Sequence, residues 1–310
     1  MMQENSMRVA IFGNNPMIYE ARRIRHELMR RTISYDFISH KRINYTESGI
    51  FYGKESLDFS HYTVAFFRSS MYTDERCTFR LENENFLLLQ QLLRHGVRVV
   101  NQEILRTYQR YNKFVQSQIF ARHAVPTPRT LHVNDNAPAN VRTALEHVKM
   151  DFPIVMKHSA GSLGAKVHYI QSDAALDAAL QGRRNKNLIF QEYIPNREDY
   201  RVLVIGGKSC GIIKRAARDG EWRNNASLGA AVAVHEDPAM ERFAEEICAR
   251  IGYDNAGVDI ILRDNAYVVL EINLTPGFEG FERATGVNVA AKFVDLLCML
   301  TTQSKVRRER

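Results

Sequence analysis

Two apolar runs in the C-terminal third alternate with polar residues and are separated by a polar turn. The first spans Gly257–Ile261, the second spans Val268–Asn273, and Arg263–Ala266 lies between them. Because successive side chains of a strand point to opposite faces, the two runs predict a β-hairpin with one apolar and one polar face. The residues expected to face the core are Val258, Ile260, Leu270 and Ile272.

The polar face of this hairpin gathers two carboxylates. If the turn centres on Asn265, Asp259 lies opposite Glu271, and Asn273 shares their face. Like charges directly opposed at about 4.5–5.5 Å destabilise a sheet, and the local sequence offers no cation. A hard metal ion, Mg²⁺ or Mn²⁺, would relieve the repulsion, since oxygen ligands suit it. The alternative is a surface hairpin whose acids are solvated.

The first hundred residues alternate short apolar runs with helical patterns. Predicted strands are Val9–Phe12, Tyr35–Ile38, Thr63–Phe67 and Val97–Val100. One helix is expected after Pro16 to about Arg31, and another over Leu81–His95, where Gly96 provides a C-cap. This order predicts a small α/β domain with a mostly parallel sheet over residues 1–100.

The pattern changes near residue 101. A helix is expected over Tyr108–His123, and two strands, Pro153–Lys157 and Val167–Ile170, bracket a glycine-containing loop. A helix over residues 172–180 then leads to an apolar run, Leu188–Ile194. We therefore expect a central subdomain over residues 101–187.

The rest of the chain reads as a second subdomain over residues 188–300, followed by a basic tail, 301–310. A hairpin is expected from Arg201–Ile205 and Ser209–Arg215, turning at Gly206-Gly207. Asp237 as N-cap and Pro238 at the first helical position open a helix whose apolar stripe belongs to the core.

Composition narrows the class of protein. The 310 residues are 45% hydrophobic and 25% charged, which is ordinary for a globular protein. No apolar run is long enough to span a membrane, so no membrane partner is expected. Four dispersed cysteines without a CxxC pair argue against a zinc site or a disulfide framework and fit the cytoplasm. The net charge of +7 favours acidic partners such as nucleotides or carboxylate-rich substrates.

Three further segments carry candidate chemistry. Lys157 ends a strand before the small residues 159–164, whose backbone N–H groups could approach phosphate oxygens. Gln191–Ile194 ends a strand where backbone groups could meet a purine edge. Lys214-Arg215 and residues 222–225 gather cations and amides suited to phosphoryl oxygens. Each segment by itself also reads as a flexible loop, an edge strand or a solvated basic hairpin.

The order of these motifs is more specific than any single one. A lysine before a glycine loop, Gln-Glu-Tyr-Ile, an Arg-x-Asn segment, Gly-Val-Asp and Glu-x-Asn-x-x-Pro-Gly follow one another. In this the chain resembles the ATP-grasp superfamily, and most of all its RimK-type ligases, which add glutamate to the C-terminus of a small-subunit ribosomal protein. The resemblance runs from about Met7 to Leu297 and is specific at residues 278–282 and 285–290.

The resemblance implies a fold of mixed α/β and α+β class. A pre-ATP-grasp α/β domain would precede an ATP-grasp fold that holds ATP between its two subdomains. It implies Asp259, Glu271 and Asn273 as ligands of two Mg²⁺ or Mn²⁺ ions.

It also implies which residues contact ATP and the substrates. Lys113 and Lys157 would contact phosphates, Glu192-Tyr193 would form the adenine hinge, and Asp199 would contact ribose. The implied catalytic residues are Arg215, Arg223 and Asn225, with Arg223 also near the phosphates. Arg68 matches an arginine that could bind an amino-acid carboxylate.

Two segments depart from the family pattern. Ala165-Lys166-Val167 stands where the glycine loop usually runs to Gly-Val, and Gly229-Ala230 stands where paired glycines are common. The second change lies near the expected acceptor site, so the identity of the acceptor does not transfer from the family.

The expected activity is an ADP-forming, ATP-dependent carboxylate–amine ligase that works through an acylphosphate. Glutamate is the expected amino acid, and a protein or peptide C-terminus is the expected acceptor. The alternatives are the same reaction on a small metabolite, carrier protein or peptide natural product, and a nucleotide-binding module without turnover. A nucleic-acid binder rests on charge alone and lacks a recognisable motif. A homo-oligomer is compatible with the sequence.

Overall fold

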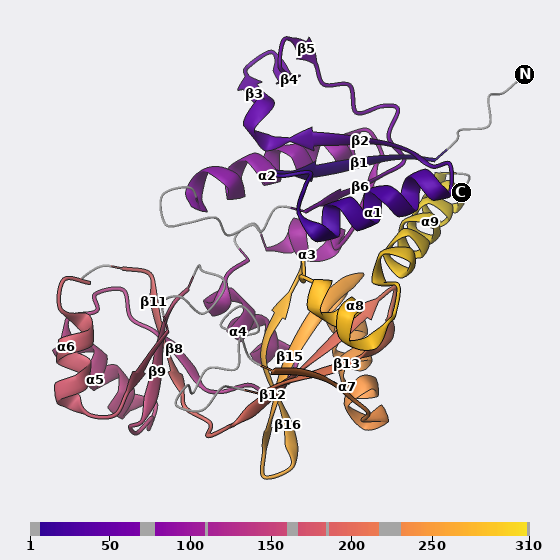
Figure 1. Ribbon diagram of the computed structural model, residues 1–310. Helices are drawn as coiled ribbons and strands as arrows, with labels where there is room; N and C mark the ends of the chain where they lie inside the picture. Colours follow the sequence, from indigo (N-terminus) through magenta and orange to yellow (C-terminus); the bar gives the residue numbers. More distant parts are fainter. Residues whose placement is uncertain are drawn as a thin grey trace, which may run out of the picture.

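The computed structural model describes residues 7–68, 78–108, 111–159, 167–183, 186–216 and 231–308. Three main sheets organise these residues: a parallel N-terminal sheet, a central antiparallel sheet and a C-terminal antiparallel sheet. Figure 1 shows the N-terminal domain above, with the central and C-terminal sheets side by side below it. The predicted mixed α/β class is confirmed.

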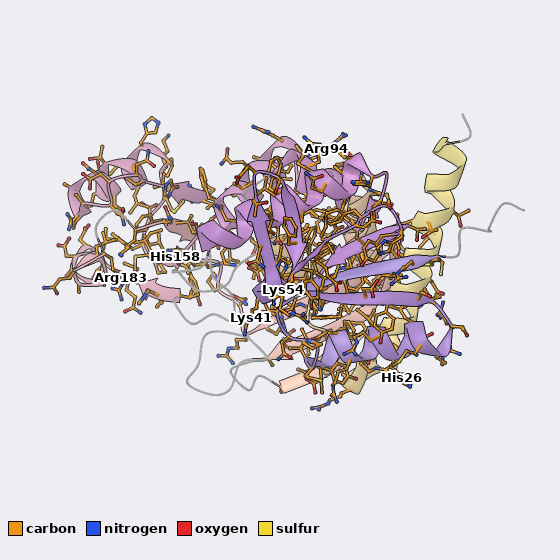
Figure 2. The ribbon with its side chains drawn as sticks, turned by 90° about the horizontal axis from the view of Figure 1, so that it is seen from above. His26, Lys41, Lys54, Arg94, His158 and Arg183 are labelled. Atoms are coloured by element: carbon orange, nitrogen blue, oxygen red, sulfur yellow. The ribbon has the colours of Figure 1, made fainter. Side chains whose placement is uncertain are left out.

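The N-terminal sheet has the strand order β2-β1-β6-β7 and is parallel throughout. Its strands are β1 (Arg8–Gly13), β2 (Ser34–Ser39), β6 (Val64–Phe67) and β7 (Arg98–Val99). Helices α1 (Tyr19–Arg30) and α2 (Thr78–Arg94) cover opposite faces, so both faces of the central strands β1 and β6 are buried, whereas the edge strand β2 is mostly half-buried. Figure 2 shows the arrangement through His26 on α1 and Arg94 on α2, which lie on opposite sides of the strands.

A small antiparallel sheet inside this domain was not predicted. It consists of β3 (Ile43–Thr46), β4 (Gly49–Tyr52) and β5 (Glu55–Ser56), preceded by a short 3₁₀ helix, η1 (His40–Arg42). Most of its residues are half-buried or exposed, with no long apolar run. The periodic signal that marks a core strand is therefore absent from this stretch of sequence.

The predicted helix over Tyr108–His123 is wrong at its start. The structure instead has two helices, α3 (Gln102–Thr107) and α4 (Lys113–Arg122). Asn112 begins α4 as its N-cap, because its side-chain oxygen accepts a hydrogen bond of 3.0 Å from the Val115 N–H. Lys113 thus occupies the first turn of a helix.

The central sheet has the strand order β10-β9-β11-β8. Its strands are β8 (Thr130–His132), β9 (Ile154–His158), β10 (Val167–Ile170) and β11 (Leu188–Glu192), and its helices are α5 (Pro138–His147) and α6 (Asp173–Leu180). Because β11 pairs with both β8 and β9, the expected boundary between residues 187 and 188 falls too early. The central sheet continues to Glu192, and Figure 2 shows this subdomain, with His158 and Arg183, projecting to one side.

The C-terminal sheet has the strand order β14-β13-β12-β15-β16. Its strands are β12 (Glu198–Ile205), β13 (Lys208–Ala216), β14 (Ala231–His235), β15 (Asn255–Arg263) and β16 (Ala266–Asn273). Asp264 and Asn265 both have positive φ, 51° and 65°, as a two-residue hairpin turn requires. Asp259 lies opposite Glu271, so the predicted register is confirmed.

The expected core position of Leu270 is wrong because β16 carries a bulge. Asp259 pairs with Glu271, but Ile260 pairs with Val269, which leaves Leu270 as the extra residue. Val258, Ile260 and Ile272 join the core against α7 (Pro238–Ile251). Leu270 instead packs in a small apolar cluster with Ile194, Ile261 and Val268.

The N-terminal domain is fastened to the C-terminal sheet through a buried carboxylate. Glu282, on α8 (Glu279–Thr285), accepts hydrogen bonds from the Tyr19 hydroxyl at 2.7 Å and from Arg23 Nε at 2.8 Å. A second junction is made by Asn101, whose Nδ2 donates to the Asn255 carbonyl at 2.9 Å. The family-specific segment around residue 282 therefore has a structural role: it holds two domains together.

The last helix is part of this junction. α9 (Val289–Arg308) buries Phe293, Val294 and Leu297 in the same apolar cluster as the N-terminal sheet. No single helix in the described part of the chain has the length and apolarity to cross a membrane, and α8 and α9 pass that test only as a pair bent by 115°.

We predict that Gly257→Ala destabilises the protein by about 1–3 kcal/mol, because an added Cβ would lie 2.8 Å from Pro276 Cβ. The matched control is Gly280→Ala in α8, where no atom lies within 4 Å of the new Cβ and helix propensity favours alanine. Urea unfolding measures the free energy of unfolding of both variants, and the comparison holds when their m-values are equal. An unchanged midpoint for Gly257→Ala would contradict this close approach.

Candidate functional site

A row of charged side chains crosses three neighbouring strands of the C-terminal sheet. Arg201 on β12 lies opposite Asp259 on β15, which in turn lies opposite Glu271 on β16. The guanidinium of Arg201 donates from Nε and Nη2 to the two oxygens of Asp259, each at 2.7 Å. This forked pairing fixes the Asp259 carboxylate in one orientation.

A second arginine, Arg215, also forms an ion pair with Asp259. Arg215 Nη2 lies 3.3 Å from Asp259 Oδ1, while Arg215 Nε donates to Asp199. All three side chains are buried. Burial raises the pKa of Asp199 to about 6, although Arg215 opposes the rise. Asp199 therefore belongs to this arginine–carboxylate cluster, and its ribose contact stays a prediction.

The other carboxylate of the row is held by a lysine from α4. Lys113 Nζ donates to Glu271 Oε2 at 2.6 Å, and Asn273 Nδ2 donates to Glu271 Oε1 at 3.2 Å. Burial alone would raise the pKa of Glu271, but Lys113, Lys157 and Arg201 hold that pKa well below its usual range. Glu271 is therefore a carboxylate at every physiological pH.

Lys113 also connects the site to the central sheet. Its backbone N–H donates to the Ser159 carbonyl at 3.0 Å, directly after β9. Lys157 on β9 donates from Nζ to Gln191 Oε1 at 2.6 Å. Burial, together with the charge of Lys113, lowers the pKa of Lys157 to about 8. Two lysines thus meet where the central and C-terminal sheets come together.

The predicted adenine hinge lies at the exit of β11. Glu192 is held by the Arg129 N–H at 3.2 Å and by Arg263 at 3.0 Å. The ring of Tyr193 packs edge-on against the ring of Tyr169, with 4.7 Å between the ring centroids. Ile194, which follows, lies in the small apolar cluster with Leu270. An apolar surface at the end of a strand suits a purine, and the adenine contact stays a prediction.

The donor set fits a magnesium ion that is bound together with phosphates. Asp259, Glu271 and Asn273 offer carboxylate and amide oxygens on one face of one hairpin. Over the described ranges, no group of three or more His, Cys, Asp or Glu side chains could hold a metal ion. Since magnesium completes its shell with water and substrate phosphates, two carboxylates and an amide are sufficient.

Some predicted site residues fall outside the part of the chain that the structure describes, and Arg68 makes other contacts. Arg223, Asn225 and most of the glycine loop (160–166) fall outside them. Arg68 pairs with none of the charged row and donates to the Thr275 carbonyl at 2.8 Å and the Pro276 carbonyl at 3.2 Å. Its contact with an amino-acid carboxylate stays a prediction.

Arg201 was missed by sequence reasoning. The spacing in the sequence could have indicated it, because Arg201 lies two positions after Asp199 and therefore shares the same face of β12. The one cation within the hairpin, Arg263, pairs with Glu192, and the fold brings Arg201, Arg215 and Lys113 to the two acids. The repulsion that suggested a metal is therefore already offset by these cations.

Comparisons with known proteins identify a family for most of the chain. Residues 110–297 match a family model described as a RimK-like ATP-grasp domain. A probable alpha-L-glutamate ligase of Parasynechococcus marenigrum is 28% identical over 94% of the chain, which spans only 62% of that relative. Similarly named proteins are 32% identical in Legionella pneumophila (66% of the chain, 70% of the relative) and 27% in Saccharophagus degradans (94% and 95%).

Solved structures show the same fold. A RimK domain ATP-grasp protein from Sphaerobacter thermophilus matches with a TM-score of 0.69 and 20% identity, over 93% of this chain and 98% of that one. The ATP-grasp ligase PsnB, complexed with a minimal precursor, matches with a TM-score of 0.68 and 19% identity, over 95% and 100%. At these identities the match establishes the ATP-grasp fold.

We predict that ATP binding weakens as the pH rises through about 8, because Lys157 loses its proton there and with it the charge that attracts phosphate. Affinity for a non-hydrolysable ATP analogue should fall about tenfold between pH 7 and pH 9. Lys157→Arg, which stays charged, should flatten the profile. Calorimetric titration measures both, and equal slopes in the two proteins would refute the role of Lys157.

Proposed function

The chain belongs to the RimK-like ATP-grasp family, and on that premise we propose that it is an ATP-dependent carboxylate–amine ligase. The observation that carries the proposal is the alternation of charge in the site. Acids suited to magnesium and cations suited to phosphate are paired with one another, as Arg201 with Asp259 and Lys113 with Glu271. Each member of a pair is complementary to one component of magnesium-bound ATP.

The charges in the site explain how both components fit. Four cations, Lys113, Lys157, Arg201 and Arg215, lie with three carboxylates, Asp199, Asp259 and Glu271. A triphosphate would take the lysines, and metal ions, two by our proposal, would take Asp259 and Glu271. When bound, magnesium would offset the charge on the phosphate oxygens. Neither component alone replaces every broken ion pair, so we expect ATP and metal to bind together.

The reaction that we propose is the one expected of an ADP-forming carboxylate–amine ligase. An oxygen of the substrate carboxylate attacks the γ-phosphorus of ATP, ADP leaves, and an acylphosphate forms. The amine nitrogen then attacks the acyl carbon, phosphate leaves and the nitrogen loses a proton. Lys157 and Arg215 hold the phosphoryl oxygens during transfer, with Arg223 and Asn225 assigned the neighbouring contacts. The enzyme needs no covalent nucleophile.

We propose glutamate as the amino acid and a protein or peptide C-terminus as the carboxylate that is activated. The relatives named alpha-L-glutamate ligases support the amino acid. PsnB complexed with a precursor peptide supports a polypeptide acceptor, while the similar fold of D-cycloserine synthetase keeps a small metabolite as the alternative. A screen of amino acids and acceptors, read by mass spectrometry, separates these. Cytoplasmic location and homo-oligomerisation stay predictions.

Turnover should require Mg²⁺ or Mn²⁺, and Glu271→Gln should reduce it on the order of 100-fold or more. Mutation of residues that only hydrogen-bond to a metal ligand already costs about 10–100-fold in metal affinity or activity. The control is Glu279→Gln, the same change on a half-exposed carboxylate of α8. ADP release measures activity, and circular dichroism checks that both variants fold. Full activity of Glu271→Gln, or of the native chain in excess chelator, would contradict the proposed metal site.

The acylphosphate predicts two chemical signatures. Hydroxylamine supplied in place of the amine should yield a hydroxamate of the acceptor, because it attacks the same acyl carbon. The nucleotide product should be ADP, since the bond broken lies at the γ-phosphorus. Accumulation of AMP and pyrophosphate would exclude this route, whereas ADP formed only with another amino acid would overturn the choice of glutamate alone.

A further inference from the structure

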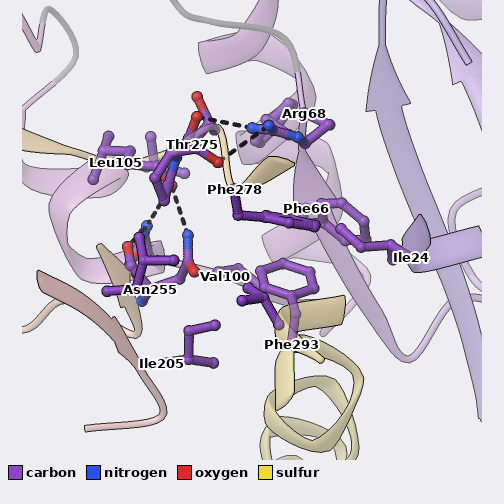
Figure 3. Close-up of a pocket in the computed structure, with 16 residues that line it drawn as sticks. Ile24, Phe66, Arg68, Val100, Leu105, Ile205, Asn255, Thr275, Phe278 and Phe293 are labelled. Atoms are coloured by element: carbon purple, nitrogen blue, oxygen red, sulfur yellow. Dashed lines mark hydrogen bonds between the residues drawn. The ribbon is translucent and has the colours of Figure 1, made fainter. Parts of the chain in front are cut away.

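The segment that directly follows the proposed metal site, residues 274–278, is held by side chains from the N-terminal domain. It begins after Asn273, the last residue of β16, and leads into α8. Arg68, which directly follows β6, donates from Nη1 to the Thr275 carbonyl at 2.8 Å and from Nη2 to the Pro276 carbonyl at 3.2 Å. Figure 3 shows the guanidinium of Arg68 turned toward Thr275. One arginine of another domain thus binds two successive carbonyls of the segment.

Glu20, in the first turn of α1, holds both this arginine and the segment. Its Oε2 lies 3.3 Å from Arg68 Nη2, and its Oε1 accepts a hydrogen bond of 3.0 Å from the Phe278 N–H. Only 13% of the Glu20 side chain and 10% of the Arg68 side chain are exposed. Because hydrogen bonds of charged groups are the strong ones, Glu20 fixes the orientation of Arg68 together with the end of the segment.

The other end of the segment is held by two asparagines. Asn255 Nδ2 donates to the Leu274 carbonyl at 2.9 Å, and Asn101 Nδ2 donates to it at 3.4 Å. Asn273 is the last residue of its strand, and strand ends open more readily than the middle of a sheet. Since magnesium demands near-ideal octahedral geometry, a ligand at this place depends on support from the segment that follows it.

We propose that Glu20 is a positioning residue for the metal site, which acts through Arg68 and the 274–278 segment to hold Asn273 in place. The inference rests on the proposed function and deepens it, since it makes metal binding depend on how the N-terminal domain is seated. The contact of Arg68 with an amino-acid carboxylate is a separate prediction, which the experiment keeps apart.

Calorimetric titration of the full-length chain with a non-hydrolysable ATP analogue, at a series of Mg²⁺ concentrations, tests this role without turnover. Glu20→Gln keeps an acceptor for the Phe278 N–H but loses the charge opposite Arg68. It should need about tenfold more Mg²⁺ for the same tightening of analogue binding, the lower end of what residues that orient metal ligands contribute. Binding without Mg²⁺ should be unchanged, because the lysines proposed to bind phosphate lie on α4 and β9.

Glu27→Gln is the matched control. Glu27 is a second buried carboxylate of α1, about two turns from Glu20, and it holds Arg30 and Arg31 instead of the segment. Arg31 also pairs with Asp295 of α9, so this variant loosens the same domain junction at another point. It should leave the Mg²⁺ requirement unchanged.

Gly277→Ala tests the same contact without removing a charge. The added Cβ would lie 3.3 Å from Glu20 Oε1, which must shift by a few tenths of an ångström. The variant should raise the Mg²⁺ requirement by less than Glu20→Gln does, whereas Gly280→Ala, with no atom within 4 Å of its Cβ, should not raise it. Gly277 is exposed, so this pair decides if Glu20→Gln does not fold.

The inference is overturned if the folded Glu20→Gln variant needs no more Mg²⁺ than the native chain, or if Glu27→Gln raises the requirement equally. It is also overturned if Glu20→Gln changes only the amino-acid concentration that turnover needs, which would place Glu20 at the amino-acid carboxylate instead. Failure of the proposed function looks different: the native chain itself would bind the analogue equally with and without Mg²⁺, and the inference would fall with it.

Discussion

The opposition of Asp259 and Glu271 is the constraint on which the rest of the site depends. Two carboxylates directly across neighbouring strands would push β15 and β16 apart unless cations approach both. The structure brings those cations from distant parts of the chain: Arg201 from β12 and Lys113 from α4. The pair of acids thereby fixes where another strand and a helix of a different sequence region must lie.

This arrangement also explains why the site sits between two sheets. Lys113 pairs with Glu271 of the C-terminal sheet, and its backbone is bonded to Ser159 at the end of the central sheet. Lys157 lies close enough for its charge to lower the pKa of Glu271. A buried ion pair that loses one partner is costly, so a ligand that enters must replace what it displaces. In the complex that we propose, magnesium and a triphosphate would replace the partners of both carboxylates and lysines.

Local sequence pattern predicts the two acids of this site but not the cations that pair with them: the resemblance alone pointed to Lys113 and Arg215, and nothing pointed to Arg201. The alternation around Asp259 and Glu271 and the turn at Asp264-Asn265 determine the register, because side-chain period and turn length are local properties. Arg201 and Arg215 meet Asp259 only through strand pairings that span many residues, so no short window reveals them. The bulge at Leu270 and the capped start of α4 at Asn112 likewise depend on packing and a side-chain bond, which hydrophobic periodicity does not record.

Exchange of partners between the ion pairs and magnesium-bound ATP is the central claim, and a crystal structure with magnesium and a non-hydrolysable ATP analogue tests it most directly. In the structure described above, Lys113 Nζ lies 2.6 Å from Glu271 Oε2. In the complex that pair should open, Lys113 should contact a phosphate oxygen, and oxygens of Asp259 and Glu271 should lie about 2.0–2.1 Å from magnesium. A complex in which the Lys113–Glu271 pair stays closed, with the phosphates bound elsewhere, would contradict the claim.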